Sequence, residues 1–210
     1  MKKILSYPLP IYADLPQSTA NWLADRHRAA LLIHDMQKYF VDFFKTETNP
    51  IIGVISNIYM LLSIARNFNI PVFYTAQPGS MTPEQRGLLK DIWGEGMKSI
   101  DEHREIIPLL TPIKDEIVLT KWRYSAFFKS NLLNHLRDLN RSQLIICGVY
   151  AHIGCLSTAI DAYSHDIETF FVSDAVADFS EEKHHMALKM AAEICAVVAS
   201  TEQIIVNLRK

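Results

Sequence analysis

Ala29-Ala-Leu-Leu-Ile33 is a run of five apolar residues with no polar break. A strand with one exposed face alternates apolar and polar residues, whereas a strand covered on both faces is apolar throughout. The run therefore predicts a strand buried between two layers of helices. His34 and Asp35 follow it directly, so two titratable side chains are expected where this strand ends.

Five further short apolar runs predict five more strands, over residues 71–75, 116–120, 143–149, 169–173 and 196–199. The stretches between them carry apolar residues at steps of three and four, which is the spacing of amphipathic helices. These stretches predict helices over residues 50–68, 130–139, 154–164 and 180–195, and a last helix that a capping box opens at 200–203. Asn49 is expected to be the N-cap of the first of these helices and Pro50 its first residue.

The alternation of buried strands with helices is typical of a parallel sheet covered on both faces. The sequence therefore predicts an α/β fold with three layers, α/β/α, around a six-stranded and mostly parallel sheet. The chain has 210 residues, no internal repeat and no Gly/Ser-rich linker, so residues 1–210 are expected to form a single domain.

Composition and charge exclude several classes of protein. Hydrophobic residues make up 49% of the chain and charged residues 21%, which rules out an intrinsically disordered chain. A formal net charge of −2 does not favour a nucleic-acid binder. The sequence shows no signal-peptide core and no apolar span of about 20 residues. Three cysteines without CxxC spacing predict free thiols, so a cytoplasmic protein that binds neither membrane nor nucleic acid is expected.

Sheets of this kind bind their ligands beyond the carboxyl ends of their strands. Polar or glycine-containing segments follow five of the six predicted strands: His34-Asp35, Gln77-Pro78, Lys121 to Arg123, Tyr150 to Cys155, and Asp174. A carboxylate, a lysine and a glycine-containing turn are therefore expected to converge at one edge of the sheet. The long segment 77–108 is expected to cover them as a lid.

These same segments resemble the sequence blocks of the isochorismatase-like hydrolases. The blocks are Arg28–Phe40, Tyr74–Ser80, Leu119–Phe127, Gly148–Leu156 and Val176–Ser180. They occur in the family's order, and the resemblance extends from about residue 4 to residue 205. Within the family, the blocks are most similar to the isochorismatases of aryl-siderophore synthesis and their phenazine-pathway relatives.

The resemblance separates this chain from the family's nicotinamidase-like members. Those enzymes use an Asp, a Lys and a nucleophilic Cys, and the position of that Cys corresponds to Gly154 here. Cys155 comes one residue later, and on a helix one residue turns a side chain by about 100°. The nicotinamidases also bind a metal after their second strand, where this chain reads Thr75-Ala-Gln-Pro78. No metal and no cofactor are therefore expected.

The resemblance implies hydrolysis of isochorismate, whose enolpyruvyl vinyl ether is split into pyruvate and 2,3-dihydro-2,3-dihydroxybenzoate. Asp35 is expected to be the general acid, and no covalent intermediate is needed. Lys121 is expected to anchor a substrate carboxylate or the charge that develops on oxygen. Because Lys121 lowers the pKa of Asp35 while burial and bound carboxylates raise it, Asp35 is expected to be protonated mainly in the substrate complex.

Further substrate contacts are expected from Gln77, Arg86, Tyr150 and Gly154, and an apolar wall from Trp93, Tyr124 and Phe43. The family places a non-proline cis peptide at Val149–Tyr150. His34 is expected to be a satisfied core residue, because successive strand residues face opposite sides. Asp174 and Asp178 are expected to be structural, and Cys147 and Cys195 to be inert core thiols.

Several alternatives stay open. The substrate of a phenazine-pathway enzyme is 2-amino-2-deoxyisochorismate, and the sequence does not separate a ring hydroxyl from a ring amine. A cysteine amidohydrolase that uses Cys155 and a non-catalytic docking domain of a siderophore synthetase are the other interpretations. No C-terminal aryl carrier domain is expected after Lys210. A homodimer and siderophore synthetase partners are expected from the family.

Overall fold

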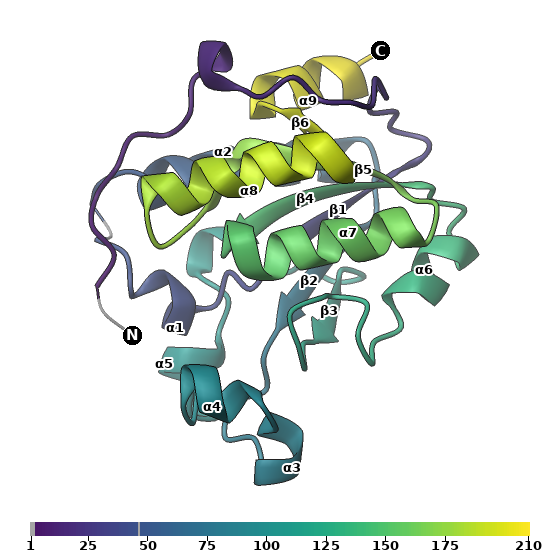
Figure 1. The fold of residues 1–210 in the computed structure, drawn as a ribbon. Helices are drawn as coiled ribbons and strands as arrows, with labels where there is room; N and C mark the ends of the chain where they lie inside the picture. Colours follow the sequence, from purple (N-terminus) through teal and green to yellow (C-terminus); the bar gives the residue numbers. More distant parts are fainter. Residues whose placement is uncertain (1–2, 46) are drawn as a thin grey trace.

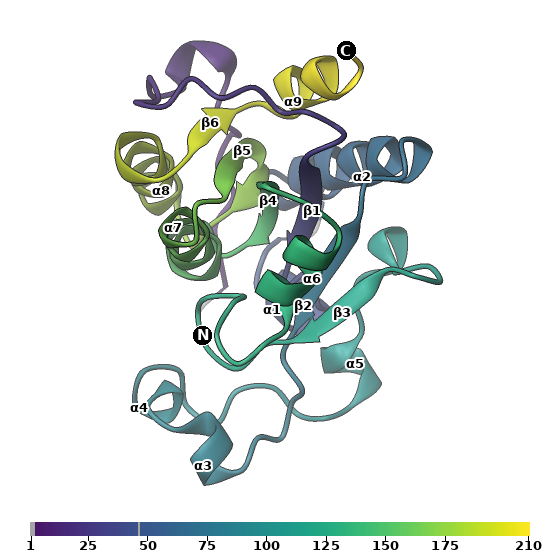
Figure 2. The ribbon, with the colours of Figure 1, turned by 90° about the vertical axis from the view of Figure 1, so that its right-hand side faces the viewer.

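Strand β1 (Ala29–His34) lies inside a six-stranded sheet with the order β3-β2-β1-β4-β5-β6, in which every neighbouring pair is parallel. The computed structural model describes residues 3–45 and 47–210. Figure 1 shows the sheet between its helices, and Figure 2 shows the same layers from the side. The predicted three-layer α/β/α fold with a six-stranded parallel sheet is confirmed.

The other strands are β2 (Val72–Ala76), β3 (Ile117–Thr120), β4 (Gln143–Val149), β5 (Glu168–Ala177) and β6 (Val197–Ala199). The helices are α1 (Lys38–Val41), α2 (Ile51–Asn67), α3 (Pro83–Arg86), α4 (Leu89–Trp93), α5 (Asp101–Arg104), α6 (Leu132–Asp138), α7 (Leu156–Ser164), α8 (Glu181–Ile194) and α9 (Thr201–Leu208). Within the described residues, no helix has the length and apolar character needed to cross a bilayer.

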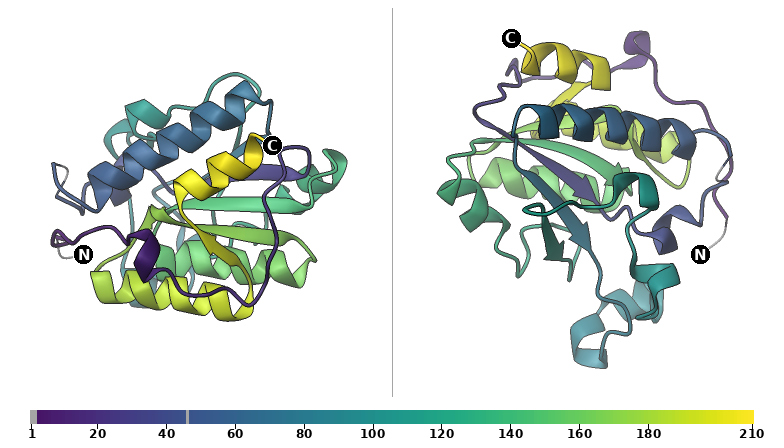
Figure 3. Two further views of the ribbon diagram at one scale, coloured as in Figure 1. Left: turned by 90° about the horizontal axis from the view of Figure 1, so that it is seen from above. Right: turned by 180° about the vertical axis from the view of Figure 1, so that it is seen from behind.

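Two hydrophobic clusters hold the layers together, one on each face of the sheet. Helices α2 and α9 cover one face, and α6, α7 and α8 cover the other (Figure 3). Because successive side chains of a strand point to opposite faces, β1 supplies both clusters: Leu31 and Ile33 pack in one, Ala30 and Leu32 in the other. The unbroken apolar run in β1 is thus explained by burial on both faces.

Several boundaries differ from the sequence prediction, and two of these differences change the position expected for a named residue. Strand β5 extends to Ala177 and pairs with the end of β4 beyond a bulge, so Asp174 lies inside the strand and not after it. Helix α2 has Pro50 as its N-cap residue, so the expected Asn49 N-cap with Pro50 as the first helical residue is wrong. The Asn49–Pro50 peptide bond is cis.

The segment between β2 and β3 extends beyond the carboxyl ends of the strands and carries the short helices α3, α4 and α5 (Figure 1). One buried side chain holds both of its ends. Gln37 Nε2 donates to the carbonyl oxygens of Gln77, at 3.0 Å, and Arg104, at 2.8 Å, while Gln37 Oε1 accepts from the Gln77 N–H at 2.8 Å. Gln37 therefore fixes the segment 77–104 against the end of β1.

Candidate active site

An ion pair lies at the carboxyl ends of β1 and β3. Lys121 Nζ donates to Asp35 Oδ2 at 2.9 Å, and both side chains are almost fully buried, with 3% and 7% exposed. The Thr75 hydroxyl, at the end of β2, donates to Asp35 Oδ1 at 2.5 Å. Three neighbouring strands therefore converge on one carboxyl group, as parallel strands allow.

The backbone of Asp35 leaves the strand conformation. Its φ is +51°, in the left-handed region that few residues other than glycine adopt, and such strain is concentrated at active sites. The alternation of side chains along β1 therefore does not extend to Asp35. His34 Nδ1 lies only 3.7 Å from Asp35 Oδ2, although the sequence reasoning placed the two side chains on opposite sides.

The charge state of Asp35 depends on opposing effects. Burial raises its pKa, but Lys121, His34 and the Thr75 hydroxyl all favour the carboxylate, and the net result is a pKa below the ordinary value. Burial and the Lys121 charge lower the pKa of His34 to about 4, so its ring is neutral at pH 7. In the protein alone, Asp35 is therefore a carboxylate paired with Lys121.

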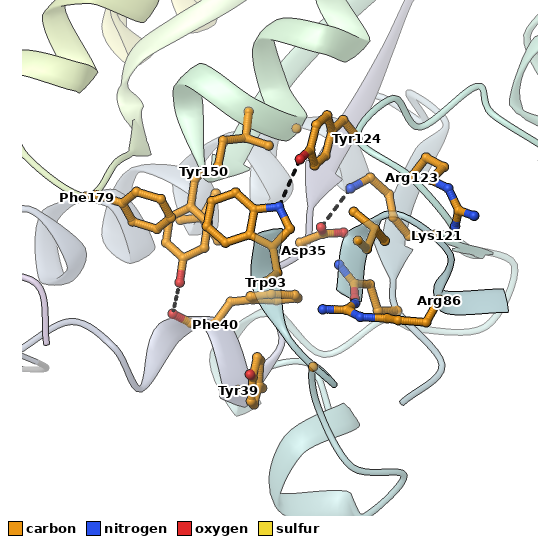
Figure 4. A pocket seen from close by; sticks show the side chains of 16 residues that line it. Asp35, Tyr39, Phe40, Arg86, Trp93, Lys121, Arg123, Tyr124, Tyr150 and Phe179 are labelled. Atoms are coloured by element: carbon orange, nitrogen blue, oxygen red, sulfur yellow. Dashed lines mark hydrogen bonds and ion pairs between the residues drawn. The ribbon is translucent and has the colours of Figure 1, made fainter. Parts of the chain in front are cut away.

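This pair lies at the base of a pocket, and most of the site residues predicted from the sequence line that pocket (Figure 4). The predicted residues that line it are Asp35, Gln77, Arg86, Trp93, Lys121, Tyr124, Tyr150 and Gly154. Phe43 is not among the lining residues, and its ring instead packs edge-on against Tyr39 at 5.3 Å. The aromatic residues of α1 that line the pocket are Tyr39 and Phe40.

Arginines give the pocket a positive character. Arg86, in α3, is 5% exposed and donates from Nε to the Gly94 carbonyl at 2.8 Å. Arg123 also lines the pocket, and its Nη1 donates to the carbonyls of Gln85 and Trp122. Among the described residues, Asp35 is the only acidic one in the lining, so Arg86, Lys121 and Arg123 outnumber it. A ligand with more than one negative charge fits this balance.

Aromatic rings form the opposite wall. Trp93 Nε1 donates to the Tyr124 hydroxyl at 2.9 Å, and the Trp93 ring lies 5.9 Å from that of Phe179. Phe179 in turn lies 4.3 Å from Tyr150, whose hydroxyl donates to the Phe40 carbonyl at 2.9 Å. Figure 4 shows these rings facing the Asp35–Lys121 pair. The wall suits a planar, unsaturated ring.

The turn after β4 adds Tyr150, Ile153 and Gly154 to the pocket. The Val149–Tyr150 peptide bond is cis, as the family resemblance implied. Residues 151–155 form a π-helical turn, so regular helix α7 begins at Leu156 and not at Gly154. Asp178 fastens the turn, because its carboxylate accepts from the His152 main-chain N–H at 2.6 Å and bonds His152 Nδ1 at 2.7 Å.

Other titratable residues lie away from the pocket. Asp174 Oδ1 accepts from the N–H and hydroxyl of Thr201, so Asp174 binds the first residue of α9 and does not join the other strand-end residues. Cys155 is fully buried in the cluster between the sheet and helices α6 to α8, and burial raises its pKa well above the ordinary value. Across residues 3–45 and 47–210 there is no cluster of three metal-ligating side chains.

Sequence reasoning missed several residues that shape the site. Thr75, Gln37, Arg123 and Phe179 were not selected. All four lie inside the quoted sequence blocks or beside a selected residue, so the signal was position at a strand end. The residue type alone did not identify these positions, because a threonine or glutamine is as common in an ordinary turn as in a functional site.

The pocket with the buried Asp35–Lys121 pair lies at the carboxyl ends of the parallel strands, where enzymes with an α/β sheet bind their substrates. The model of the isochorismatase domain matches residues 29–203. The chain is 50% identical over 206 residues to an isochorismatase of Bacillus subtilis, covering 98% of this chain and 66% of that protein. The chain belongs to the isochorismatase family.

Two further relatives and one solved structure extend the comparison. The chain is 50% identical over 202 residues to the phenazine biosynthesis protein PhzD of Pseudomonas fluorescens, covering 96% of this chain and 97% of that one. It is 47% identical to enterobactin synthase component B of Escherichia coli, covering 97% of this chain and 71% of that one. A cysteine hydrolase from Pseudomonas syringae has the same fold, with a TM-score of 0.83, 22% identity and coverage of 98% and 99%.

Proposed function

We propose that this protein hydrolyses the enolpyruvyl vinyl ether of isochorismate, which yields 2,3-dihydro-2,3-dihydroxybenzoate and pyruvate. The observation that carries the proposal is a buried Asp35–Lys121 pair in a pocket whose described lining contains cationic and aromatic residues but no Ser, Thr or Cys. An acid, anion anchors and a water molecule are sufficient for this hydrolysis. The relative of B. subtilis with 50% identity carries the same activity in its name.

Asp35 is the general acid in this proposal. Its carboxyl proton is transferred to the methylene carbon of the vinyl ether, which leaves an oxocarbenium ion. Water adds to that ion and returns a proton to Asp35. The resulting hemiketal then breaks its bond to the ring oxygen, and the proton of its hydroxyl group passes to that oxygen as the carbonyl of pyruvate forms. One water is consumed, pyruvate leaves, and the ring oxygen stays with the diol.

Substrate binding supplies the proton that Asp35 lacks in the free protein. Isochorismate carries two carboxylates, and negative charge close to Asp35 raises its pKa. Lys121 and Arg86 are the proposed partners of these carboxylates, with Gln77 as a hydrogen-bond donor. When Lys121 turns from Asp35 toward the substrate, the effect that lowers the Asp35 pKa is weakened, and burial then favours the protonated acid.

Pyruvate release tests the proposal. The purified protein is incubated with isochorismate in the presence of a chelator, and pyruvate is coupled to lactate dehydrogenase. The parent and the Cys155→Ala variant are expected to release pyruvate, and Asp35→Asn is expected to lose at least about 100-fold in kcat, which is the range of general acid catalysis. Loss of activity in Cys155→Ala would instead support a cysteine amidohydrolase, although Cys155 does not line the pocket.

The phenazine-pathway reaction on 2-amino-2-deoxyisochorismate is the second candidate, supported by the 50% identity to PhzD. It breaks the same bond, so the same assay with this substrate compares the two by their kcat/KM. A protein that releases pyruvate from neither substrate would fit a cysteine amidohydrolase or a non-catalytic docking domain.

We also propose a homodimer that works beside a siderophore synthetase. The support is the similarity to enterobactin synthase component B, whose name places that relative in a synthetase. Light scattering that gives twice the mass of one chain would support the dimer, and the mass of one chain would refute it.

A further inference from the structure

The ring of His34 lies against Gly154 in the pocket wall. A Cβ atom added to Gly154 would lie 2.2 Å from His34 Cε1 and 2.9 Å from its Nε2, closer than Cβ atoms approach other groups. Gly154 does not have a left-handed φ, so its backbone accepts any residue. It is therefore the histidine ring, and not the backbone, that requires glycine at this position.

The ring is fixed in place. His34 is fully buried, and because Val149 presents a carbonyl oxygen, His34 Nδ1 donates to it at 2.9 Å. On the main-chain side, a Cβ atom on Gly148 would lie 2.1 Å from the His34 carbonyl oxygen, so the two strands are in close contact there. His34 Nε2 has no hydrogen-bond partner within the described residues. Only one of the two ring nitrogens makes a hydrogen bond, so the main contribution of His34 at this place is the space that its ring occupies.

Gly154 is part of the pocket wall, and a side chain at this position has no room while the His34 ring is present. Gly154 lines the pocket together with Asp35 and Lys121, whereas Cys147, Cys155 and Cys195 are buried and none of them lines it. The structure from P. syringae named a cysteine hydrolase shows that the fold itself is found with thiol chemistry. In this chain, the contact between His34 and Gly154 is what excludes a side chain from position 154 of the pocket wall.

We propose that His34 determines the type of reaction at this site, because its ring reserves position 154 for glycine and keeps the space beside Asp35 for substrate and water. The inference deepens the proposed function and rests on it only for the identity of the substrate. His34 acts through Gly154 and is a positioning residue.

A double-mutant cycle tests the contact without any substrate. Gly154→Ala in the parent is expected to lower Tm by roughly 5 °C or more, since overpacking a rigid core is destabilising. In a His34→Asn background, which keeps an N–H donor for Val149 but removes the ring, the same change is expected to lower Tm by at most a third as much. His34→Val serves as a second background if His34→Asn does not fold.

A thiol at position 154 gives an independent readout. Gly154→Cys combined with His34→Asn is expected to be alkylated by iodoacetamide at position 154 at least tenfold faster than any cysteine of the folded parent, because a thiol near Lys121 has a lowered pKa. Peptide mass spectrometry locates the label. Gly154→Cys alone is expected to give a destabilised protein, with a Tm loss like that of Gly154→Ala.

The control is Gly53→Ala, since Gly53 meets Leu9 and Asn49 and not His34. Its effect on Tm is expected to be the same in both backgrounds. The proposal is overturned if Gly154→Ala leaves the parent Tm unchanged, or if its effect is additive with that of His34→Asn. Because neither readout needs turnover, these outcomes are distinct from a failure of the protein to release pyruvate.

Discussion

At the scale of single residues, Asp35 is surrounded by groups that stabilise its charge. A general acid must hold a proton, yet Lys121, His34 and Thr75 all lower its pKa in the free protein. This arrangement is consistent with an acid that becomes active only when a dianion displaces the Lys121 contact. In the free protein, the same arrangement keeps Asp35 ionised.

Removal of the Thr75 hydroxyl changes this balance in a measurable direction. Thr75→Val deletes the hydrogen bond to Asp35 Oδ1, so the Asp35 pKa rises. Because the acid must be protonated, the falling basic limb of kcat/KM is expected to move to higher pH with it. Thr169→Val, a buried threonine of β5 away from the pocket, is the control. An unmoved limb would show that Thr75 does not tune the acid.

Lys121 affects both stability and pH dependence. Lys121→Met leaves a buried carboxylate without its partner, which costs about 3–5 kcal/mol at pH 7. The Asp35 pKa then rises above its unfolded value, so stability is greatest below that value and is lost as pH rises through the new folded pKa. Urea unfolding is expected to show a larger deficit at pH 7 than at pH 5. An equal deficit at both pH values would contradict this account.

At the scale of elements, the segment that carries α3 to α5 supplies Arg86 and Trp93 and is held by Gln37. Gln37→Leu removes three hydrogen bonds at its ends, so KM is expected to rise about tenfold or more with a smaller change in kcat. Steady-state kinetics measures the split.

Gln143 is the matched control for this variant. It is also fully buried, and its side chain bonds the Asp25 N–H, the Leu23 carbonyl and the Glu168 carboxylate. It lies at the start of β4, at the opposite end of the sheet. Gln143→Leu is expected to lower stability without a change in KM, and a KM effect of equal size would remove the special role of Gln37.

The sequence was sufficient to predict the elements whose pattern is strong. All six strands and the helices α2 and α6 to α9 were predicted. Strands that are buried on both faces are runs of apolar residues, and amphipathic helices have apolar residues at steps of three and four, so both patterns can be recognised in the sequence. The end of β5 was missed, because the polar Asp174 was expected to follow the strand, whereas the ladder to β4 continues beyond a bulge to Ala177. The same misjudged end put Asp174 among the residues expected to follow a strand.

The pocket itself was predicted from strand ends, and its details were not. Asp35, Lys121 and Gln77 follow strands directly, so topology brings them together. Phe43 was predicted to belong to the apolar wall, but α1 presents Tyr39 and Phe40 to the pocket instead. The contact between His34 and Gly154 lies at the π-helical turn 151–155, and no periodicity in the sequence predicts such a turn.

At the scale of the whole molecule, the three thiols test whether the chemistry depends on cysteine. Cys147, Cys155 and Cys195 are all buried, and burial raises the pKa of each. Iodoacetamide is therefore expected to leave the native protein unlabelled and its turnover unchanged, while the unfolded chain reacts at all three sites. Mass spectrometry measures the labelling, and inactivation that parallels a single label would contradict the account.

The most direct test of acid-catalysed vinyl ether hydrolysis is to determine which atoms of the products come from water. Turnover of isochorismate in ¹⁸O-labelled D₂O, followed by mass spectrometry, is expected to place one deuterium in the pyruvate methyl group and no ¹⁸O in the dihydrodiol, because water attacks the enolpyruvyl carbon and the ring keeps its oxygen. The Asp35→Asn variant is expected to form these products at least about 100-fold more slowly. Heavy oxygen in the dihydrodiol, or Asp35→Asn turnover at the parent rate, would contradict the account.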